Sequence, residues 1–134
     1  TEAQARAAGL TEEQIALPPL GGDLDGGVFI GLTTAKDGKH YAVALLADKP
    51  EGELTWKKAI AWAESVGGVL PTRPVAALAF ATAKDQFEPT WHWTADEYDG
   101  SGAWGQGFTS GGQGSTHKST EFRVRAVRLI QLTA

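Results

Sequence analysis

Residues 91–128, in the C-terminal third of the chain, limit the possible folds of this sequence more than any other segment does. Four short runs of aromatic or β-branched residues are separated there by stretches rich in glycine and serine. Such runs predict β-strands, and the stretches between them predict loops. The run 111–116 lacks the context of a phosphate-binding loop and is interpreted as a flexible loop. Because loops held on a rigid scaffold usually carry recognition, the segment predicts a loop-built binding surface.

Composition limits the class of protein. A chain of 134 residues can bury the core of one domain. Its net charge of -4 and the absence of a basic stripe argue against a nucleic-acid partner. The sequence has no cysteine, which excludes disulfides and thiolate metal sites. Its apolar runs are too short to cross a bilayer, so we expect no membrane insertion.

A hairpin and two helices are predicted upstream of this segment. Strand-like runs at 28–32 and 41–46 flank a turn at 36–39 that contains Asp-Gly. Thr55 is a suitable N-cap for a helix whose apolar residues recur at helical spacing until Gly67-Gly68. A second helix is expected to begin between Thr72 and Pro74. Its expected inward residues are Val75, Leu78, Ala79 and Thr82.

Residues 1–26 are predicted to form an N-terminal arm or linker, followed by one domain at 27–134. The arm begins with a helix-compatible stretch that Pro18-Pro19 and Gly21-Gly22 must end. Arms of this kind attach a domain to a larger particle or join copies into a homo-oligomer, and a frayed tail is the alternative. Thr1 is a residue after which an initiator methionine is commonly removed. We therefore expect a protein that is made in the bacterial cytoplasm and either stays there or is assembled into a virion, for example into its tail.

An ordered set of motifs runs from the predicted first helix to the last predicted strand. It comprises Thr55-Trp56, Ala59, the run Gly67-Gly68-Val69-Leu70-Pro71-Thr72, the run His92-Trp93-Thr94-Ala95-Asp96-Glu97-Tyr98, Ala103-Trp104, Phe108 and Arg125-Ala126-Val127-Arg128. This order resembles the DUF1566 family, with its tryptophan-led helix, Leu-Pro-Thr turn, Tyr-Trp-Ser-Ser strand and closing Arg-Ala-Val-Arg strand. Two departures stand out: Ala63 replaces a frequent cysteine, and Pro74-Val75 replace a glutamate that commonly follows the turn.

The resemblance implies an α+β fold of the C-type lectin-like type, with two helices, a small antiparallel sheet and long glycine-rich loops. This fold is related in shape to variable phage adhesins and to formylglycine-generating enzymes. Scaffold roles are implied for Trp56, Leu70, Trp93, Trp104, Arg125 and Arg128. The two arginines are expected to alternate with valines along the last strand and to pin a long loop, with Asp96, Glu97 or Asp99 as partners.

The remaining aromatic and small polar residues are candidates for ligand contact, because such residues compose loop-built recognition surfaces. We expect Tyr98, Gln106 and His117 to be exposed contacts. Trp91 and Phe108 are added as further ligand-binding candidates.

Catalysis is not expected. The three histidines, His40, His92 and His117, are not spaced as metal ligands, and neither Ser110 nor Ser115 lies in a nucleophile elbow. The acidic residues at 96–99 lie in a segment with the composition of a loop, and we expect them to solvate that loop. Formylglycine-generating chemistry requires cysteines, which this sequence lacks. No cofactor or metal site is predicted. Calcium-dependent sugar binding is kept as an alternative, although no EF-hand loop is present.

Two functions from different classes follow. The first is a non-enzymatic phage or prophage module that binds a bacterial surface receptor, protein or glycan, as a receptor-binding or virion-associated protein such as a tail fibre. The second is a small cytosolic phage protein that binds and inhibits a host protein, its acidic balance meeting a basic host surface.

Overall fold

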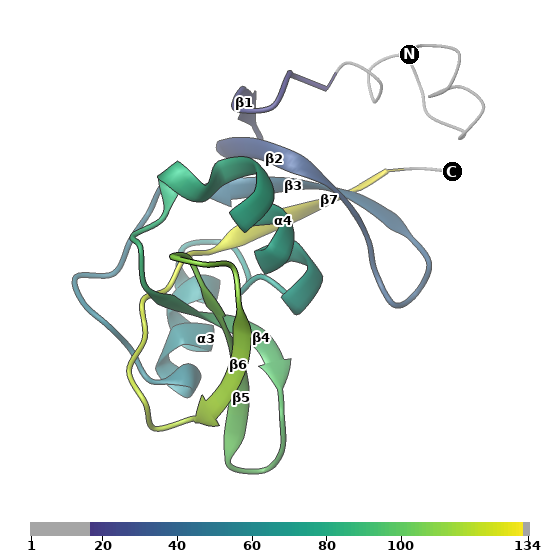
Figure 1. Cartoon of the computed structure of the whole chain (residues 1–134). Coiled ribbons are helices and arrows are strands. Elements are labelled where there is room, and N and C mark those ends of the chain that lie inside the picture. The colour runs from purple at the N-terminus through teal and green to yellow at the C-terminus, as the bar shows by residue number, and fades with distance from the viewer. Residues whose placement is uncertain (1–16, 133–134) are drawn as a thin grey trace.

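The structure, a computed structural model, describes residues 17–132 and has an α+β architecture of two helices and two antiparallel sheets (Figure 1). The predicted class is therefore confirmed at the level of α+β. Of the expected arm, residues 1–16 lie outside the described residues. Residues Asp23–Leu24 form the short strand β1, so the sheet begins before the expected domain start. Within residues 17–132, no helix is long and apolar enough to cross a membrane.

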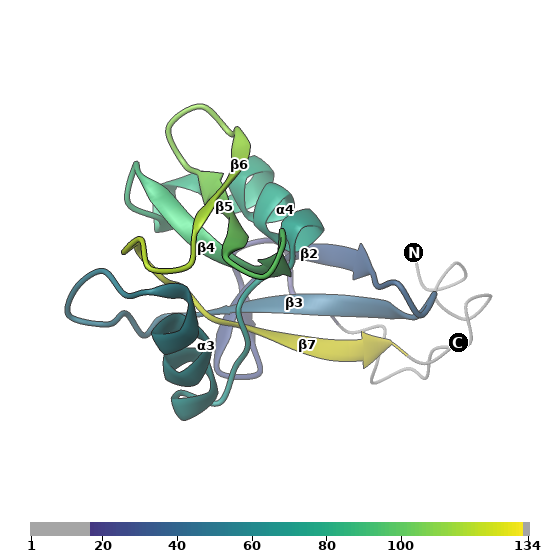
Figure 2. The same cartoon turned by 90° about the horizontal axis from the view of Figure 1, so that it is seen from below.

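The larger sheet has the order β1-β2-β3-β7, with β2 at Gly27–Thr34, β3 at His40–Leu46 and β7 at Val127–Leu132. The predicted hairpin is the β2–β3 pair. Strand β3 lies between β2 and β7 (Figure 2), and its residues 42–46 are buried. Because both faces of this central strand are covered, its sequence is a continuous apolar run rather than an alternating one.

The two predicted helices are confirmed. Helix α3 spans Trp56–Ser65 with its C-cap at Val66, and Gly67 just beyond adopts the left-handed conformation with φ of 80°. Helix α4 spans Arg73–Ala83 and is followed by a 3-10 turn, η1, at Lys84–Gln86. The Thr72 hydroxyl accepts a hydrogen bond from the Val75 N–H at 3.4 Å, so Thr72 caps α4.

The smaller sheet has the order β4-β5-β6, with β4 at Trp91–Glu97, β5 at Gly102–Gly107 and β6 at Gln113–His117. Strand β6 corrects the expectation of a flexible loop at 111–116. Its backbone pairs with β5 from Gly102 opposite His117 to Gln106 opposite Gln113. Backbone pairing needs no apolar alternation, which is why the glycine-rich composition of β6 concealed a strand.

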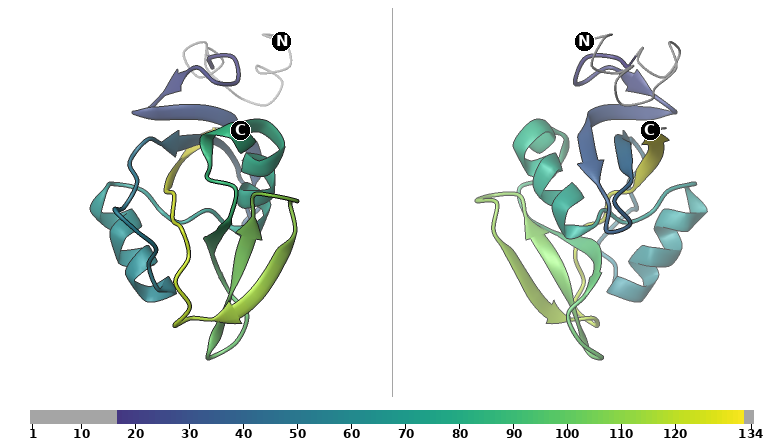
Figure 3. Two further views of the ribbon diagram at one scale, coloured as in Figure 1. Left: turned by 60° about the vertical axis from the view of Figure 1, so that its left-hand side comes forward. Right: turned by 90° about the vertical axis from the view of Figure 1, so that its right-hand side faces the viewer.

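The apolar core forms two clusters on either side of β3. Val43 and Leu45 belong to the cluster that includes α4, whereas Leu46 belongs to the cluster that includes α3 and Trp93. This follows from the alternation of side chains along a strand. The two views of Figure 3 place α3 and α4 on opposite sides of the molecule, as two such clusters require.

The expected last strand begins later than predicted. Strand β7 starts at Val127, and the preceding residues run as an extended segment beside β4, where Arg123 forms an isolated bridge with His92. All four residues of 124–127 are buried. The predicted alternation of Arg125 with the core valines is therefore wrong, because this segment passes between the two sheets and is covered on all sides.

Candidate functional site

An open depression lies where the start of α4 meets the smaller sheet and the turn between β2 and β3. We call it the Trp104 depression. It is lined by Lys36, Arg73, Pro74, Ala77, Asp96, Glu97, Trp104 and Gln113. Three separate parts of the chain contribute to it, so its chemistry exists only in the folded molecule.

An arginine held against an indole ring forms the floor of the Trp104 depression. The guanidinium carbon of Arg73 lies 3.6 Å from the centroid of the Trp104 ring. Its Nε donates a hydrogen bond to Oε1 of Gln113 at 2.9 Å, and Nε2 of Gln113 donates in return to the Arg73 carbonyl at 2.9 Å. Stacking and the reciprocal amide contact fix the guanidinium in one orientation.

A buried glutamine supports this arrangement from below. Gln106 is 0% exposed, and its Oε1 accepts a hydrogen bond from Nε2 of Gln113 at 2.8 Å. Its own Nε2 donates to the carbonyls of Gly107 and Gly112. Every polar atom of the Gln106 amide is thus bonded within the protein, and the chain of contacts leads outward to Arg73. The Nη1 and Nη2 atoms of Arg73 make no hydrogen bond to another residue of 17–132 and are available to a ligand.

The turn between β4 and β5 extends the aromatic surface. Tyr98 is 59% exposed and meets the Trp104 ring edge-on, with centroids 5.5 Å apart. Asp99 shapes this turn by accepting hydrogen bonds from the N–H groups of Ser101 and Gly102 at 2.9 and 2.7 Å. These backbone hydrogen bonds lower the pKa of the Asp99 carboxyl, so it stays ionised as a turn cap.

A second, smaller depression adjoins Tyr98 and brings two predicted contact residues together. It is lined by Tyr98, Asp99, Ser101, Gly102, Ser115, Thr116 and His117. Tyr98 and His117 thus lie on one surface, because β6 places His117 opposite Gly102 at the end of the β4–β5 hairpin. Together with the Trp104 depression they form a single aromatic and polar face.

Three predicted contact residues are not on this face. The expected exposure of Gln106 is wrong because its amide is buried beneath Gln113, to which it is hydrogen-bonded. The expected exposure of Phe108 is also wrong: it is 2% exposed and stacks on Phe87 with centroids 4.0 Å apart. Trp91 is 39% exposed, stacks on Phe122 and lines neither depression.

Two of the three tryptophans assigned to the scaffold bind distant backbone, whereas the third, Trp104, lines the candidate site instead. Nε1 of Trp56 donates to the Thr94 carbonyl, and Nε1 of Trp93 donates to the Leu54 carbonyl, both at 2.8 Å. Trp93 and Leu70 are buried in the core around α3. These bonds tie α3 and its leading loop to β4, which carries one wall of the Trp104 depression.

The arginines of the closing segment bind carbonyl groups rather than the carboxylates expected for them. Arg128 donates to the carbonyls of Gly67 and Asp25 at 2.9 and 2.7 Å. Arg125 donates to the carbonyls of Gln86 and Leu46.

The three carboxylates have other partners, so the predicted pairing is wrong. Asp96 accepts from the Arg73 N–H at 2.7 Å, Glu97 pairs with Lys118 at 2.6 Å, and Asp99 caps its own turn. Each carboxylate is therefore held in a contact that involves neither Arg125 nor Arg128.

Arg73 and Lys36 are the site residues that sequence reasoning missed. Arg73 follows the Leu-Pro-Thr turn, where the N-cap and the proline account for the local pattern without it. Its contact with Trp104 depends on how α4 crosses β5, which local spacing does not encode.

The side chains exposed by the described residues are suited to binding a ligand. Across residues 17–132, no three side chains of histidine, aspartate or glutamate converge as metal ligands. His92 is buried, and burial lowers its pKa to about 4, whereas His40 bonds the hydroxyl of Thr34 far from it. The exposed face instead presents a guanidinium fork, an indole, a phenol and amides.

Comparison with known proteins adds no assignment. No protein-family model matches the chain, and no curated protein matches it.

Proposed function

We propose that this chain is a non-enzymatic binding module with a C-type lectin-like fold that recognises its ligand at the Trp104 depression. The observation that carries the proposal is the fixed guanidinium of Arg73, stacked 3.6 Å from the Trp104 centroid with two nitrogen atoms left for a ligand. A group already held in its binding orientation loses little entropy when a ligand arrives. Arginine and tryptophan are also the residues most enriched at binding hot spots.

The chemistry of the depression favours a ligand that carries a carboxylate or phosphate next to an apolar surface. The free fork of Arg73 matches the two oxygens of such an anion. Lys36 adds a second positive charge from the turn between β2 and β3. Of the two carboxylates in the lining, Glu97 is paired with Lys118 and Asp96 accepts from the Arg73 N–H. Pro74 and Ala77 supply apolar contact. Tyr98, next to Trp104, supplies an exposed ring for a sugar or side chain of a receptor.

The arrangement of elements supports the lectin-like part of the proposal. The motifs that resemble DUF1566 fall at structurally defined places: Trp56 begins α3, Thr72 caps α4, Trp93 lies in β4 and Arg128 lies in β7. The phage part rests on the resemblance to variable adhesins. In this proposal the module is a phage or prophage protein that binds a bacterial surface receptor, either as a receptor-binding protein or as part of the virion.

The cytosolic inhibitor is the competing function, and one partition experiment separates the two. Fluorescently labelled chain is incubated with intact cells from a panel of bacterial strains, and immobilised chain is incubated with lysates of the same strains. Light scattering after size exclusion gives the oligomeric state. The proposal expects saturable binding to intact cells of some strains. A monomer that ignores every cell surface and retains a cytosolic protein would overturn it.

A further inference from the structure

Strand β6 is an open edge of the smaller sheet. The sheet has the order β4-β5-β6, so within residues 17–132 only one side of β6 is paired. In both views of Figure 3 this yellow-green strand lies at the margin of the molecule. Its residues 113–117 contain no proline and no lysine, and its register with β5 has no bulge. These are three of the means by which native sheets keep other chains from an edge, and β6 lacks all of them.

The register of β6 decides which of its backbone groups face outward. Just outside the strand, the Gly112 carbonyl and the Lys118 N–H each bond the backbone on the β5 side at 2.8 Å. Hydrogen-bonded and non-hydrogen-bonded positions alternate in an antiparallel ladder, and this register is unbroken from 113 to 117. The backbone groups that point away from β5 therefore belong to Gln113, Ser115 and His117.

These outward groups are open to a second chain. Among residues 17–132, the N–H and carbonyl groups of Gln113 and Ser115 and the N–H of His117 have no hydrogen-bond partner. The His117 carbonyl accepts from the Thr120 N–H at 3.0 Å, and this bond ends the open edge. Ser115 and His117 are exposed, so an extended polypeptide can approach the strand from solvent.

Both depressions of the candidate face lie along this edge. Gln113 lines the Trp104 depression, whereas Ser115 and His117 line the smaller one. Neighbouring residues of paired strands point to the same face, and two residues of an extended chain span about 7 Å. A strand added to β6 thus directs one side chain toward Arg73 and a later, alternate side chain toward Tyr98. In strand addition, main-chain bonds give affinity, and sites for alternate side chains give specificity.

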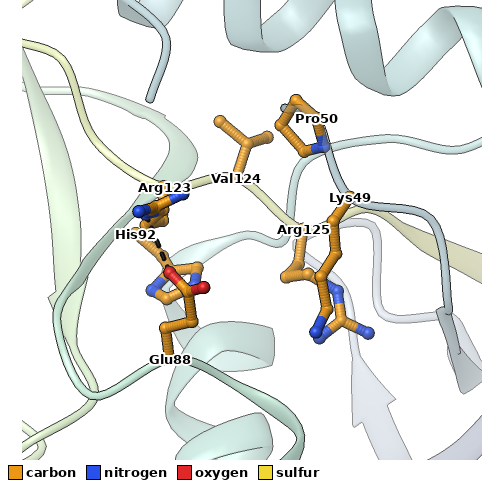
Figure 4. Close-up of a pocket in the computed structure, with 7 residues that line it drawn as sticks. All are labelled: Lys49, Pro50, Glu88, His92, Arg123, Val124 and Arg125. Carbon is orange, nitrogen blue, oxygen red and sulfur yellow. Dashed lines mark ion pairs between the residues drawn. The ribbon is translucent and has the colours of Figure 1, made fainter. Parts of the chain in front are cut away.

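A small pocket near His92 is separate from this edge. It lies between the loop after β3 and the extended segment before β7, and Arg123 and Glu88 form an ion pair there at 2.8 Å (Figure 4). None of its lining residues belongs to β6 or lines either depression. A partner bound at β6 therefore contacts residues other than these.

We propose that an extended acidic segment of a receptor protein adds to the free side of β6 as a further strand of the smaller sheet. Its backbone bonds the outward groups of Gln113 and Ser115, and a carboxylate side chain beside Gln113 pairs with Arg73 and Lys36. An acidic segment fits because neither cation forms an ion pair with an acidic side chain among residues 17–132. This inference rests on the function proposed for the Trp104 depression and narrows its partner to a polypeptide.

The first test uses short peptides selected from a displayed random library for binding to the immobilised whole chain. Amide hydrogen exchange, followed by NMR, compares the free protein with its complex with a synthetic selected peptide. We expect exchange of the Gln113, Ser115 and His117 amides to slow at least about tenfold, whereas contact through side chains alone would leave these amides unprotected. Replacing the acidic residue of the peptide by its amide should weaken binding about tenfold.

Ser115→Pro and Ser115→Ala form a matched pair of variants. Proline removes an N–H that points away from β5, so it leaves the ladder intact while its ring occupies the place of the incoming strand. We expect Ser115→Pro to bind the selected peptide at least about tenfold more weakly, and Ser115→Ala to bind it nearly as the unaltered protein does. Thermal melting checks that both variants are folded.

The proposal is overturned if no acidic peptide is selected, if the three amides stay unprotected in the complex, or if Ser115→Pro binds as Ser115→Ala does. A dimer of the chain that is lost in Ser115→Pro also overturns it, because β6 would then pair with a second copy.

Binding to intact cells separates these outcomes from failure of the proposed function. Cells that bind the chain equally before and after protease treatment support the binding function and overturn the polypeptide partner. If no strain binds the chain, the proposed function fails, while peptide selection and amide protection still decide whether a strand adds to β6.

Discussion

Gln106 is a buried amide whose hydrogen bonds reach the ligand-facing surface through Gln113. Replacing Gln106 with leucine, Gln106→Leu, keeps most of the volume but removes the acceptor for Gln113 and the donor for two glycine carbonyls. We expect a loss of about 1–3 kcal/mol in the free energy of unfolding, measured by urea denaturation. Nuclear relaxation should also show a more mobile Arg73 side chain. Gln131→Leu, at an exposed position of β7, is the control and should leave both readouts unchanged.

His92 makes the stability of this protein depend on pH in a defined window. Burial lowers its pKa from 6.5 to about 4, so the unfolded chain binds a proton at a higher pH than the folded one. The stability it contributes is complete above pH 6.5 and is lost as the pH falls toward 4. The linked loss is at most about 3 kcal/mol.

The replacement His92→Asn should remove this dependence while keeping an amide donor for the Thr90 carbonyl. Urea midpoints of the variant and of the unaltered protein are compared at several pH values between 7 and about 4. We expect their difference to shrink or reverse as the pH falls. His117→Asn, at an exposed residue, should run parallel to the unaltered protein. Parallel curves for His92→Asn would contradict the assigned pKa.

Individual residue types told less about the site than their contacts do. Tyr98 and His117 could be chosen from the sequence because exposed aromatic and polar residues in a turn signal have few other uses. Gln106 could not be placed, because an amide next to two glycines has the same composition whether it faces solvent or a second amide. Arg73 carried no signal, since its meaning depends on an indole contributed by another element.

At the scale of elements, Gly67 ends α3 in a conformation that other residues rarely adopt. Its φ is 80°, and a Cβ at this position would lie 2.8 Å from Nη2 of Arg128. Gly67→Ala should therefore cost about 1–2 kcal/mol from the backbone alone, with an added cost for displacing Arg128. The matched control is Gly100→Ala, where no atom lies within 4 Å of the added Cβ. Thermal melting should show a clear fall in Tm for the first variant and almost none for the second.

Elements bounded by clear turn or capping residues were predictable, and elements without such residues were not. The hairpin β2–β3 has an Asp-Gly turn between apolar runs, and α3 and α4 each have a threonine before them. Strand β6 has no apolar side chain, so only its pairing with β5 defines it. The last strand was predicted to begin too early. Val124 and Val127 suggest the alternation of a strand, but both are buried because two sheets meet at this segment.

At the scale of the whole molecule, β3 joins two apolar clusters, so its side chains should dominate stability. Leu45 is fully buried in the cluster that includes α4. Leu45→Ala should reduce the free energy of unfolding by about 2–5 kcal/mol. Leu32→Ala, a similar truncation at a position that is mostly exposed on β2, should cost far less. Equal costs measured by chemical denaturation would contradict the central position of β3.

The α+β class was accessible from the sequence because two helix patterns and several strand patterns share one chain. The division into two sheets was not, since strand pairing between residues 40–46 and 127–132 is a long-range contact without a local signature. The same holds for the Trp104 depression, which gathers residues from the β2–β3 turn, α4 and the smaller sheet.

Two lysines of one turn allow a direct test of whether the Trp104 depression recognises a ligand. Lys36 lines the depression, whereas Lys39 lies in the same turn but does not. Binding isotherms to intact cells of a strain that binds the unaltered protein are measured for Lys36→Ala, Lys39→Ala and Tyr98→Ala. We expect at least about a fivefold loss of affinity for Lys36→Ala and Tyr98→Ala, near 1 kcal/mol each, with Lys39→Ala unchanged. Equal affinities for all three variants and the unaltered protein would contradict it.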